Sequence, residues 1–232
     1  MKTKTIFNDL ISLLYPELCQ ACGNSLFSNE YLICLSCLYK LPKTNFHLEE
    51  NNTIERIFWG RFPLQKASSF LFFSKGSRVQ NLMHEFKYRS KKEIGFYLGD
   101  LFARELSKVN WLEDIDLIIP VPLHYRKQQI RGYNQSEEIA KGIEKHSSIP
   151  VEIGVLKRTI ASETQTKKSR FRRWENVSEI FQIDNPDKIK GKHILIIDDV
   201  ITTGATIEAC AQMLLTIEGV KISLISLAYA AN

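Results

Sequence analysis

The chain of 232 residues lacks several features that define large classes of protein. No apolar run approaches the roughly eighteen residues that a bilayer-spanning helix needs, so no membrane insertion is expected. No G-x-x-x-x-G-K-[ST] sequence occurs, which disfavours a P-loop nucleotide triphosphatase. An apolar stretch follows Lys2 and Lys4, but polar residues interrupt it and no small-residue cleavage site follows, so no secretory signal is expected. These absences predict a cytoplasmic protein.

The composition is that of an ordinary globular protein. Hydrophobic residues make up 44% of the chain and charged residues 25%. The length leaves room for one sizeable α/β domain and a small appendage. The net charge of +5 gives a modest bias toward anionic partners and does not by itself indicate nucleic-acid binding.

Four of the five cysteines form two C-x2-C pairs, which are Cys19, Cys22, Cys34 and Cys37. Two such pairs can surround one tetrahedral zinc ion, and four protein ligands leave no open position, so the predicted Zn²⁺ is structural. Two disulfides are the alternative, which a cytoplasmic location disfavours. The fifth, Cys210, lies at helical spacing from Ile207 and Leu214 and is expected in the core.

The most informative segment is residues 194–206. Four apolar residues form a predicted buried strand that ends in Asp198 and Asp199, and a helix begins near Ala205. The intervening loop can direct backbone N–H groups and hydroxyls toward an anion at the helix N-terminus. The loop residues that carry this prediction are Thr202, Thr203, Gly204, Ala205 and Thr206. The plain alternative is a buried strand capped by a polar turn.

This segment resembles the phosphoribosyl-pyrophosphate (PRPP) signature of type I phosphoribosyltransferases. The resemblance implies that residues 202–206 hold the 5-phosphate of PRPP or ribose 5-phosphate. It also implies that Asp198 and Asp199 face the ribose hydroxyls, directly or through Mg²⁺.

A second polar segment spans residues 120–135. Pro120 and Pro122 fix the backbone where a predicted strand ends, so Pro122 and Leu123 are expected to face a ligand. Arg126 and Arg131 could neutralise a pyrophosphate leaving group. A solvated loop leading into a capped helix is the alternative.

The Pro-x-Pro-Leu and Arg-Gly-Tyr-Asn-Gln elements of this segment resemble those of the ComF family of phosphoribosyltransferase-like proteins, as does the Lys-Tyr helix at residues 82–88. That family combines such a domain with an N-terminal four-cysteine finger, and the resemblance covers essentially the whole chain. It implies a role in natural transformation, with single-stranded DNA and competence DNA-uptake proteins as partners.

Residues 157–173 contain seven basic residues and one acid. Basic residues with interleaved aromatics suit single-stranded nucleic acid. The candidate residues are Lys167, Lys168, Arg170, Arg172, Arg173 and Trp174. A loop that closes over PRPP and a merely solvated basic face are the alternatives.

Apolar strands alternate with helices along most of the chain. Strands are predicted at residues 67–73, 116–121, 151–156, 181–183, 194–197 and 221–229, and helices at 6–14, 79–86, 94–107 and 205–217, with a further helix capped by Asn134. The alternation predicts a mostly parallel, doubly wound sheet of the type I phosphoribosyltransferase kind.

The predicted organisation has two parts. Residues 1–55 would form an N-terminal helix and zinc finger, and residues 56–232 the phosphoribosyltransferase-like domain. Two functions remain open. One is Mg²⁺-dependent transfer of a phosphoribosyl group to an unidentified acceptor, and the other is non-catalytic binding of single-stranded DNA by a competence factor that keeps the PRPP pocket for ligand binding or regulation.

Overall fold

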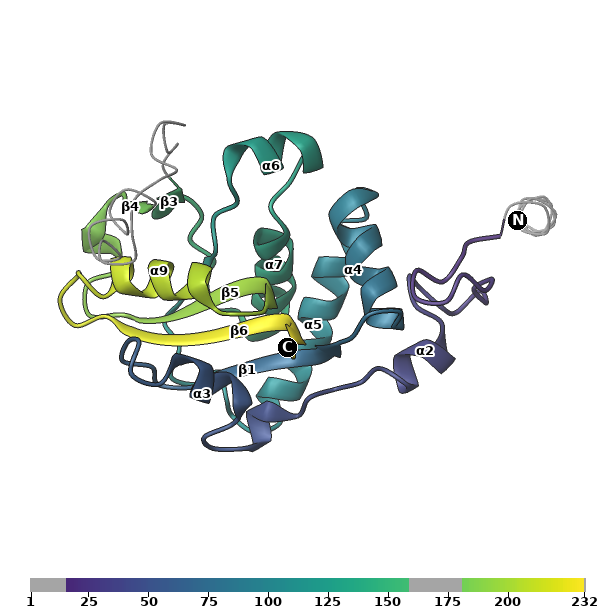
Figure 1. The fold of residues 1–232 in the computed structure, drawn as a ribbon, viewed down its shortest axis with the longest axis horizontal. Helices are drawn as coiled ribbons and strands as arrows, with labels where there is room; N and C mark the ends of the chain where they lie inside the picture. Colours follow the sequence, from purple (N-terminus) through teal and green to yellow (C-terminus); the bar gives the residue numbers. More distant parts are fainter. Residues whose placement is uncertain (1–15, 159–180, 232) are drawn as a thin grey trace.

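A computed structural model describes residues 16–158 and 181–231 of the protein. Its centre is a four-stranded sheet with the order β1-β6-β5-β2 and parallel pairing throughout (Figure 1). The strands are β1 (Ala67–Phe73), β2 (Leu117–Pro120), β5 (His193–Ile201) and β6 (Lys221–Ala230). The predicted parallel sheet is therefore confirmed, and β1 has the bounds that the sequence predicts.

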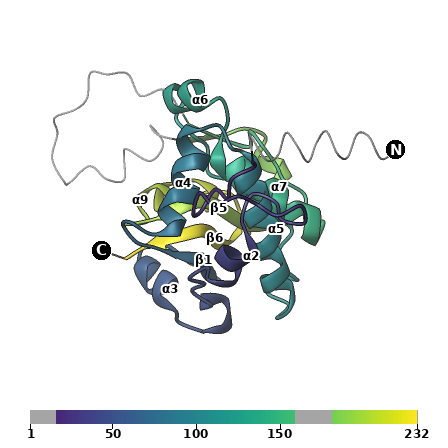
Figure 2. The same cartoon turned by 90° about the vertical axis from the view of Figure 1, so that its right-hand side faces the viewer.

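Helices and loops surround this sheet (Figures 1 and 2). The α-helices are α2 (Leu35–Tyr39), α3 (Thr53–Phe58), α4 (Arg78–Tyr88), α5 (Glu93–Ser107), α6 (Tyr125–Arg131), α7 (Gln135–Ser147) and α9 (Ala205–Leu214). Two short 3-10 helices are η1 (Phe46–Leu48) and η3 (Pro186–Lys188). In the described part of the chain, no helix is both long and apolar enough to cross a membrane.

The central strand β5 buries side chains on both faces of the sheet. Leu195 and Ile197 belong to one hydrophobic cluster, together with residues of α4, α5 and α7. Ile194 and Ile196 belong to a second cluster, together with residues of α3 and α9. Successive strand residues point to opposite faces, so an unbroken apolar run requires helices on both sides. The doubly wound arrangement follows from that run.

Close helix packing fixes α7 against α5. A Cβ atom on Gly142 would lie 2.2 Å from the carbonyl oxygen of Phe96, and one on Gly99 would lie 2.5 Å from that of Ile139. Only glycine permits this approach of the two backbones. The first turn of α7 is thereby held at the carboxyl end of β2, where Asn134 caps the helix as predicted by accepting a hydrogen bond from the Ser136 N–H.

A small antiparallel hairpin stands beside the main sheet. It consists of β3 (Leu156–Arg158) and β4 (Phe181–Ile183). The sequence predicts a strand over residues 151–156, but the structure has one bridge between Val151 and Ile118 and then a break before β3. Gly154 has a φ of +90°, which interrupts the extended backbone.

Residues 125–131 form helix α6, where the sequence predicts a ligand-facing loop. His124 caps its first turn, and Gly132 ends it with a φ of +78°. None of the residues of α6 is buried, and the helix projects at the top of the view in Figure 1. Without a buried apolar face the helix has no periodicity by which the sequence could have revealed it.

The segment before β1 packs against the sheet. Asn52 and Glu55 form a capping box at α3, and the buried Asn52 amide also donates to the Ala67 carbonyl at 2.8 Å. Phe46 of η1 stacks edge-on against Phe72 of β1. The domain boundary between residues 55 and 56 stays a prediction. The predicted helix at residues 6–14 lies outside the described residues.

Candidate functional site

The candidate site lies where the central strand β5 ends. The turn after β5 leads through Gly204, which has a φ of +76°, into helix α9 at Ala205. Backbone and side chains of this turn enclose a small pocket of about 50 Å³. Its lining residues are Asp198, Val200, Ile201, Thr202, Thr203, Gly204, Ala205, Thr206 and Ile207. The predicted phosphate-loop residues are therefore gathered around one pocket, beside Asp198.

Two residues from the N-terminal part of the chain support this turn. The Phe58 ring of α3 lies beneath Gly204, close enough that a Cβ atom there would be 2.6 Å from the ring. The Arg61 guanidinium donates to the Thr203 carbonyl at 2.9 Å and pairs with Glu208 of α9 at 3.3 Å. Neither residue is predicted from the sequence, because no local pattern links them to the turn.

The two adjacent acids have different surroundings. The Asp198 carboxylate accepts hydrogen bonds from the Asp199 N–H at 2.8 Å and from the Ser136 hydroxyl at 3.3 Å. Burial and the neighbouring Asp199 carboxylate raise the pKa of Asp198 to about 7. Asp199 instead forms an ion pair with Lys87 of α4, with 2.8 Å between Nζ and Oδ2.

Lys87 and Ser136 were not among the predicted site residues. The family resemblance includes the Lys-Tyr helix, but the sequence predicts no site role for Lys87 or for His84. In the structure Lys87 contacts Asp199, whereas His84 lies on the exposed side of α4 and contacts Glu85 and Tyr88. The first residues of α7 bring Ser136 to Asp198.

The Arg-Gly-Tyr-Asn-Gln element joins α6 and α7 to α4. Arg131 donates to the Gln135 side chain at 2.7 Å, and its guanidinium lies over the Tyr88 ring, 5.5 Å from the ring centroid. The Tyr133 hydroxyl donates to the Phe86 carbonyl, and burial raises the pKa of Tyr133 to about 12. Arg131 therefore stands next to the end of α4 that carries Lys87.

The other predicted residues of this segment lie elsewhere. Arg126 is exposed on α6. Pro122 and Leu123 line a separate pocket of about 330 Å³ between α6 and the β3–β4 hairpin, together with Lys157 and Arg158. This pocket shares no lining residue with the phosphate-loop pocket. The predicted nucleic-acid residues, from Lys167 to Trp174, lie outside the described residues.

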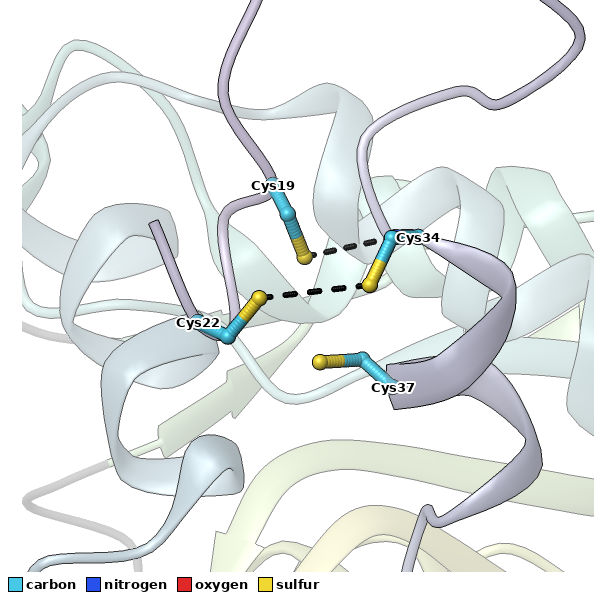
Figure 3. A group of neighbouring side chains, drawn as sticks. All are labelled: Cys19, Cys22, Cys34 and Cys37. Atoms are coloured by element: carbon cyan, nitrogen blue, oxygen red, sulfur yellow. Dashed lines mark hydrogen bonds between the residues drawn. The ribbon is translucent and has the colours of Figure 1, made fainter. Parts of the chain in front are cut away.

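The four N-terminal cysteines point toward a common centre (Figure 3). Their sulfur atoms all lie within 4.8 Å of one another, and those of Cys22 and Cys34 are 3.9 Å apart. Zinc–sulfur bonds of about 2.3 Å in a tetrahedron place the sulfurs about 3.8 Å apart. The cluster could therefore hold one zinc ion. Cys210, as predicted, is buried in the core with Ile207 and Leu214.

The cysteine-bearing segment packs against helix α4 (Figures 1 and 2). The Asn81 side chain donates to the carbonyl of Ala21, which lies between the first two cysteines, at 2.9 Å. Cys19, Cys34 and Cys37 belong to the same hydrophobic cluster as the α4 residues that face the sheet. Helix α4 thus contacts both the cysteine cluster and the acid pair.

Comparison with known proteins agrees with this geometry. Residues 95–232 match the family described as "Phosphoribosyl transferase domain". The chain is 28% identical over 218 residues to the DNA utilization protein YhgH of Shigella flexneri, covering 88% of this chain and 92% of that protein. It is 29% identical over 196 residues to the competence protein ComFC of Bacillus subtilis, covering 79% and 78%. The identity to competence protein F of Haemophilus influenzae is 28% over 137 residues, covering 57% and 60%.

The parallel sheet and the matched domain together define a type I phosphoribosyltransferase fold. The chain belongs to the ComF family of phosphoribosyltransferase-like proteins.

Proposed function

We propose that the turn at residues 202–206 binds the 5-phosphate of PRPP or ribose 5-phosphate. The observation that carries this proposal is the small pocket enclosed by that turn beside Asp198. Backbone N–H groups at the start of α9 and the threonine hydroxyls are suitable donors to a phosphate dianion. The positive end of the α9 dipole favours the same ligand charge.

The acid pair is suited to the sugar ring. Asp198 and Asp199 would accept hydrogen bonds from the ribose hydroxyls, and their charge would favour the positive charge that develops on the ring as the C1–O bond breaks. Carboxylate oxygens are also the ligands that Mg²⁺ prefers, so the pair fits the metal that this chemistry uses. Bound Mg²⁺ supplies charge stabilisation to the substrate oxygens.

The departing pyrophosphate needs cations. Arg131 is held beside Tyr88 at the end of α4, and Arg126 lies on the projecting helix α6. Guanidinium groups bind phosphate oxygens in a bidentate manner, so both arginines are suited to pyrophosphate. The proposed reaction is transfer of the phosphoribosyl group to an unidentified acceptor in the cytoplasm.

Ligand binding tests the pocket directly. PRPP with Mg²⁺ should raise the thermal midpoint of the protein, and the double variant Asp198→Asn, Asp199→Asn should lose that shift. The exposed Asp187→Asn is the matched control and should keep it. If PRPP with Mg²⁺ did not raise the thermal midpoint of the parent protein, the assignment of this pocket to the phosphate would be wrong. Pyrophosphate release from PRPP, screened against nucleobases, ammonia and DNA, separates a transferase from a binding module.

A second function is single-stranded DNA binding in DNA uptake. Its support is helix α6, which has no buried residue and carries Arg126, Lys127 and Arg131 without an acidic residue, and the names of the relatives. Binding of oligonucleotides should weaken with salt and when Arg170, Arg172 and Arg173 become Ala. If the triple variant bound oligonucleotides as tightly as the parent protein, these three arginines would not be part of the DNA site.

A further inference from the structure

The ion pair between Lys87 and Asp199 is largely shielded from solvent. The two side chains are 20% and 16% exposed, and 2.8 Å separates Nζ from Oδ2. A pair at this depth interacts more strongly than an exposed one, because less water screens it. The lysine is therefore a fixed component of the charge distribution around the acids.

Contacts along α4 hold Lys87 at the acid pair. The neighbouring Phe86 is fully buried, and its carbonyl accepts the Tyr133 hydroxyl. Asn81, six residues before Lys87, donates a hydrogen bond to the Ala21 carbonyl of the cysteine-bearing segment. With the helix held near both ends, the lysine side chain can swing but its Cα atom stays in place.

The ion pair weakens the binding of a free divalent cation to the two acids. With both carboxylates ionised, Lys87 leaves the group of three with one net negative charge. A divalent cation that arrives alone must compete with the ammonium for Asp199 Oδ2. A ligand with phosphate oxygens removes that competition, since the ammonium can move from Asp199 to the anion.

We propose that Lys87 is the resident counter-ion of the acid pair, which keeps free divalent cations off Asp199 and transfers to the pyrophosphate oxygens when PRPP arrives with its metal. This proposal rests on the proposed function and adds a role for a residue of α4. It predicts that metal and substrate enter the site together.

Two binding measurements with opposite expected signs test the role of Lys87. Mn²⁺ binding is followed by the loss of its free electron paramagnetic resonance signal, and inorganic pyrophosphate binding is followed by calorimetry without metal. Lys87→Met should bind Mn²⁺ about tenfold more tightly and pyrophosphate about tenfold more weakly, because a unit charge is removed within a few ångströms of each ligand. Lys87→Arg should resemble the parent protein in both. The exposed Lys91→Met loses the same charge and should change neither.

The outcomes separate this proposal from its alternatives. If Lys87→Met weakened both ligands or changed neither, the counter-ion role would be wrong. Lys87→Gln, checked for folding by circular dichroism, replaces the methionine variant if that one does not fold. Ribose 5-phosphate binding to the parent protein is measured in parallel. Failure of that binding overturns the proposed function, whereas normal ribose 5-phosphate binding with unchanged Mn²⁺ affinity in the variants overturns only the role of Lys87.

Discussion

The Phe58 ring lies directly against Gly204, although one residue precedes the sheet and the other opens the last helix. A Cβ atom on Gly204 would meet two ring carbons at 2.6 Å, and the backbone φ there is +76°. The glycine is therefore required twice, for its left-handed conformation and for the absence of a side chain. The shape of the proposed phosphate loop depends on a residue of α3.

Gly204→Ala should therefore damage both stability and ligand binding. We expect a loss of about 1–3 kcal/mol in the free energy of unfolding, since strain and steric overlap add. Ribose 5-phosphate binding should fall below detection in calorimetry because the turn must move. The control is Gly76→Ala, which has the same φ of +76° but no described atom within 4 Å of the new Cβ. Gly76→Ala should lower stability without weakening ligand binding. Equal ribose 5-phosphate affinity in the two variants would show that the contact between Phe58 and Gly204 does not shape the loop.

Arg61 should affect the loop more than the fold. Its hydrogen bond to the Thr203 carbonyl and its pair with Glu208 are both half-exposed, so Arg61→Met should change the free energy of unfolding by less than about 1 kcal/mol. Ribose 5-phosphate affinity should nevertheless fall about tenfold, because one hydrogen bond to the turn is lost. Arg56→Met, which removes an exposed arginine bonded to the Asn51 carbonyl, should leave affinity unchanged. The same affinity in both variants would count against a supporting role for Arg61.

The geometry of the cysteine cluster predicts that the protein contains zinc. Elemental analysis should find about one zinc per chain, and Cys37→Ser should lose it together with several degrees of thermal midpoint. Cys210→Ala should also lower the midpoint, since it leaves a cavity in the core, but it should retain the zinc. A parent protein without zinc would favour the disulfide alternative for the two pairs.

A buried histidine at the other end of the sheet predicts a pH effect on stability. His193 is 6% exposed, its Nε2 lies 2.8 Å from the Ser223 hydroxyl, and Asp114 lies 3.3 Å from its Nδ1. Burial lowers the pKa of His193, although the Asp114 carboxylate acts in the opposite direction. The unfolded chain therefore binds a proton below about pH 6.5 more readily than the folded protein, and stability falls on acidification.

His193→Gln should remove this contribution. Urea unfolding from pH 7.5 to 5.5 should show a parent protein that loses stability faster than the variant, by at most about 1.4 kcal/mol per pH unit. Other titrating groups are common to both proteins and cancel in the difference. Parallel pH profiles would show that His193 titrates alike in the folded and unfolded states.

The sequence predicted those parts of the fold and site that depend on neighbours in the chain. The apolar run before Asp198, the cap at Asn134 and the spacing of the cysteine pairs are local patterns, and the structure has each of them. The roles of the acids and of the threonine loop in ligand binding stay predictions.

The missed residues reach the site through the tertiary fold. Phe58, Arg61 and Lys87 come from segments far from the signature, and their contacts depend on how α3 and α4 pack against the sheet. No periodicity or spacing encodes such a contact. Helix α6 was missed for a different reason, since a short helix without a buried side leaves no apolar pattern in the sequence.

Helix α4 has eleven residues, with a hydrogen bond to the cysteine-bearing segment near its start and Lys87 in its last turn. If the four cysteines hold zinc, loss of the metal would loosen the segment on which the start of this helix leans and so displace Lys87 from Asp199, although no cysteine of the cluster lines the phosphate-loop pocket.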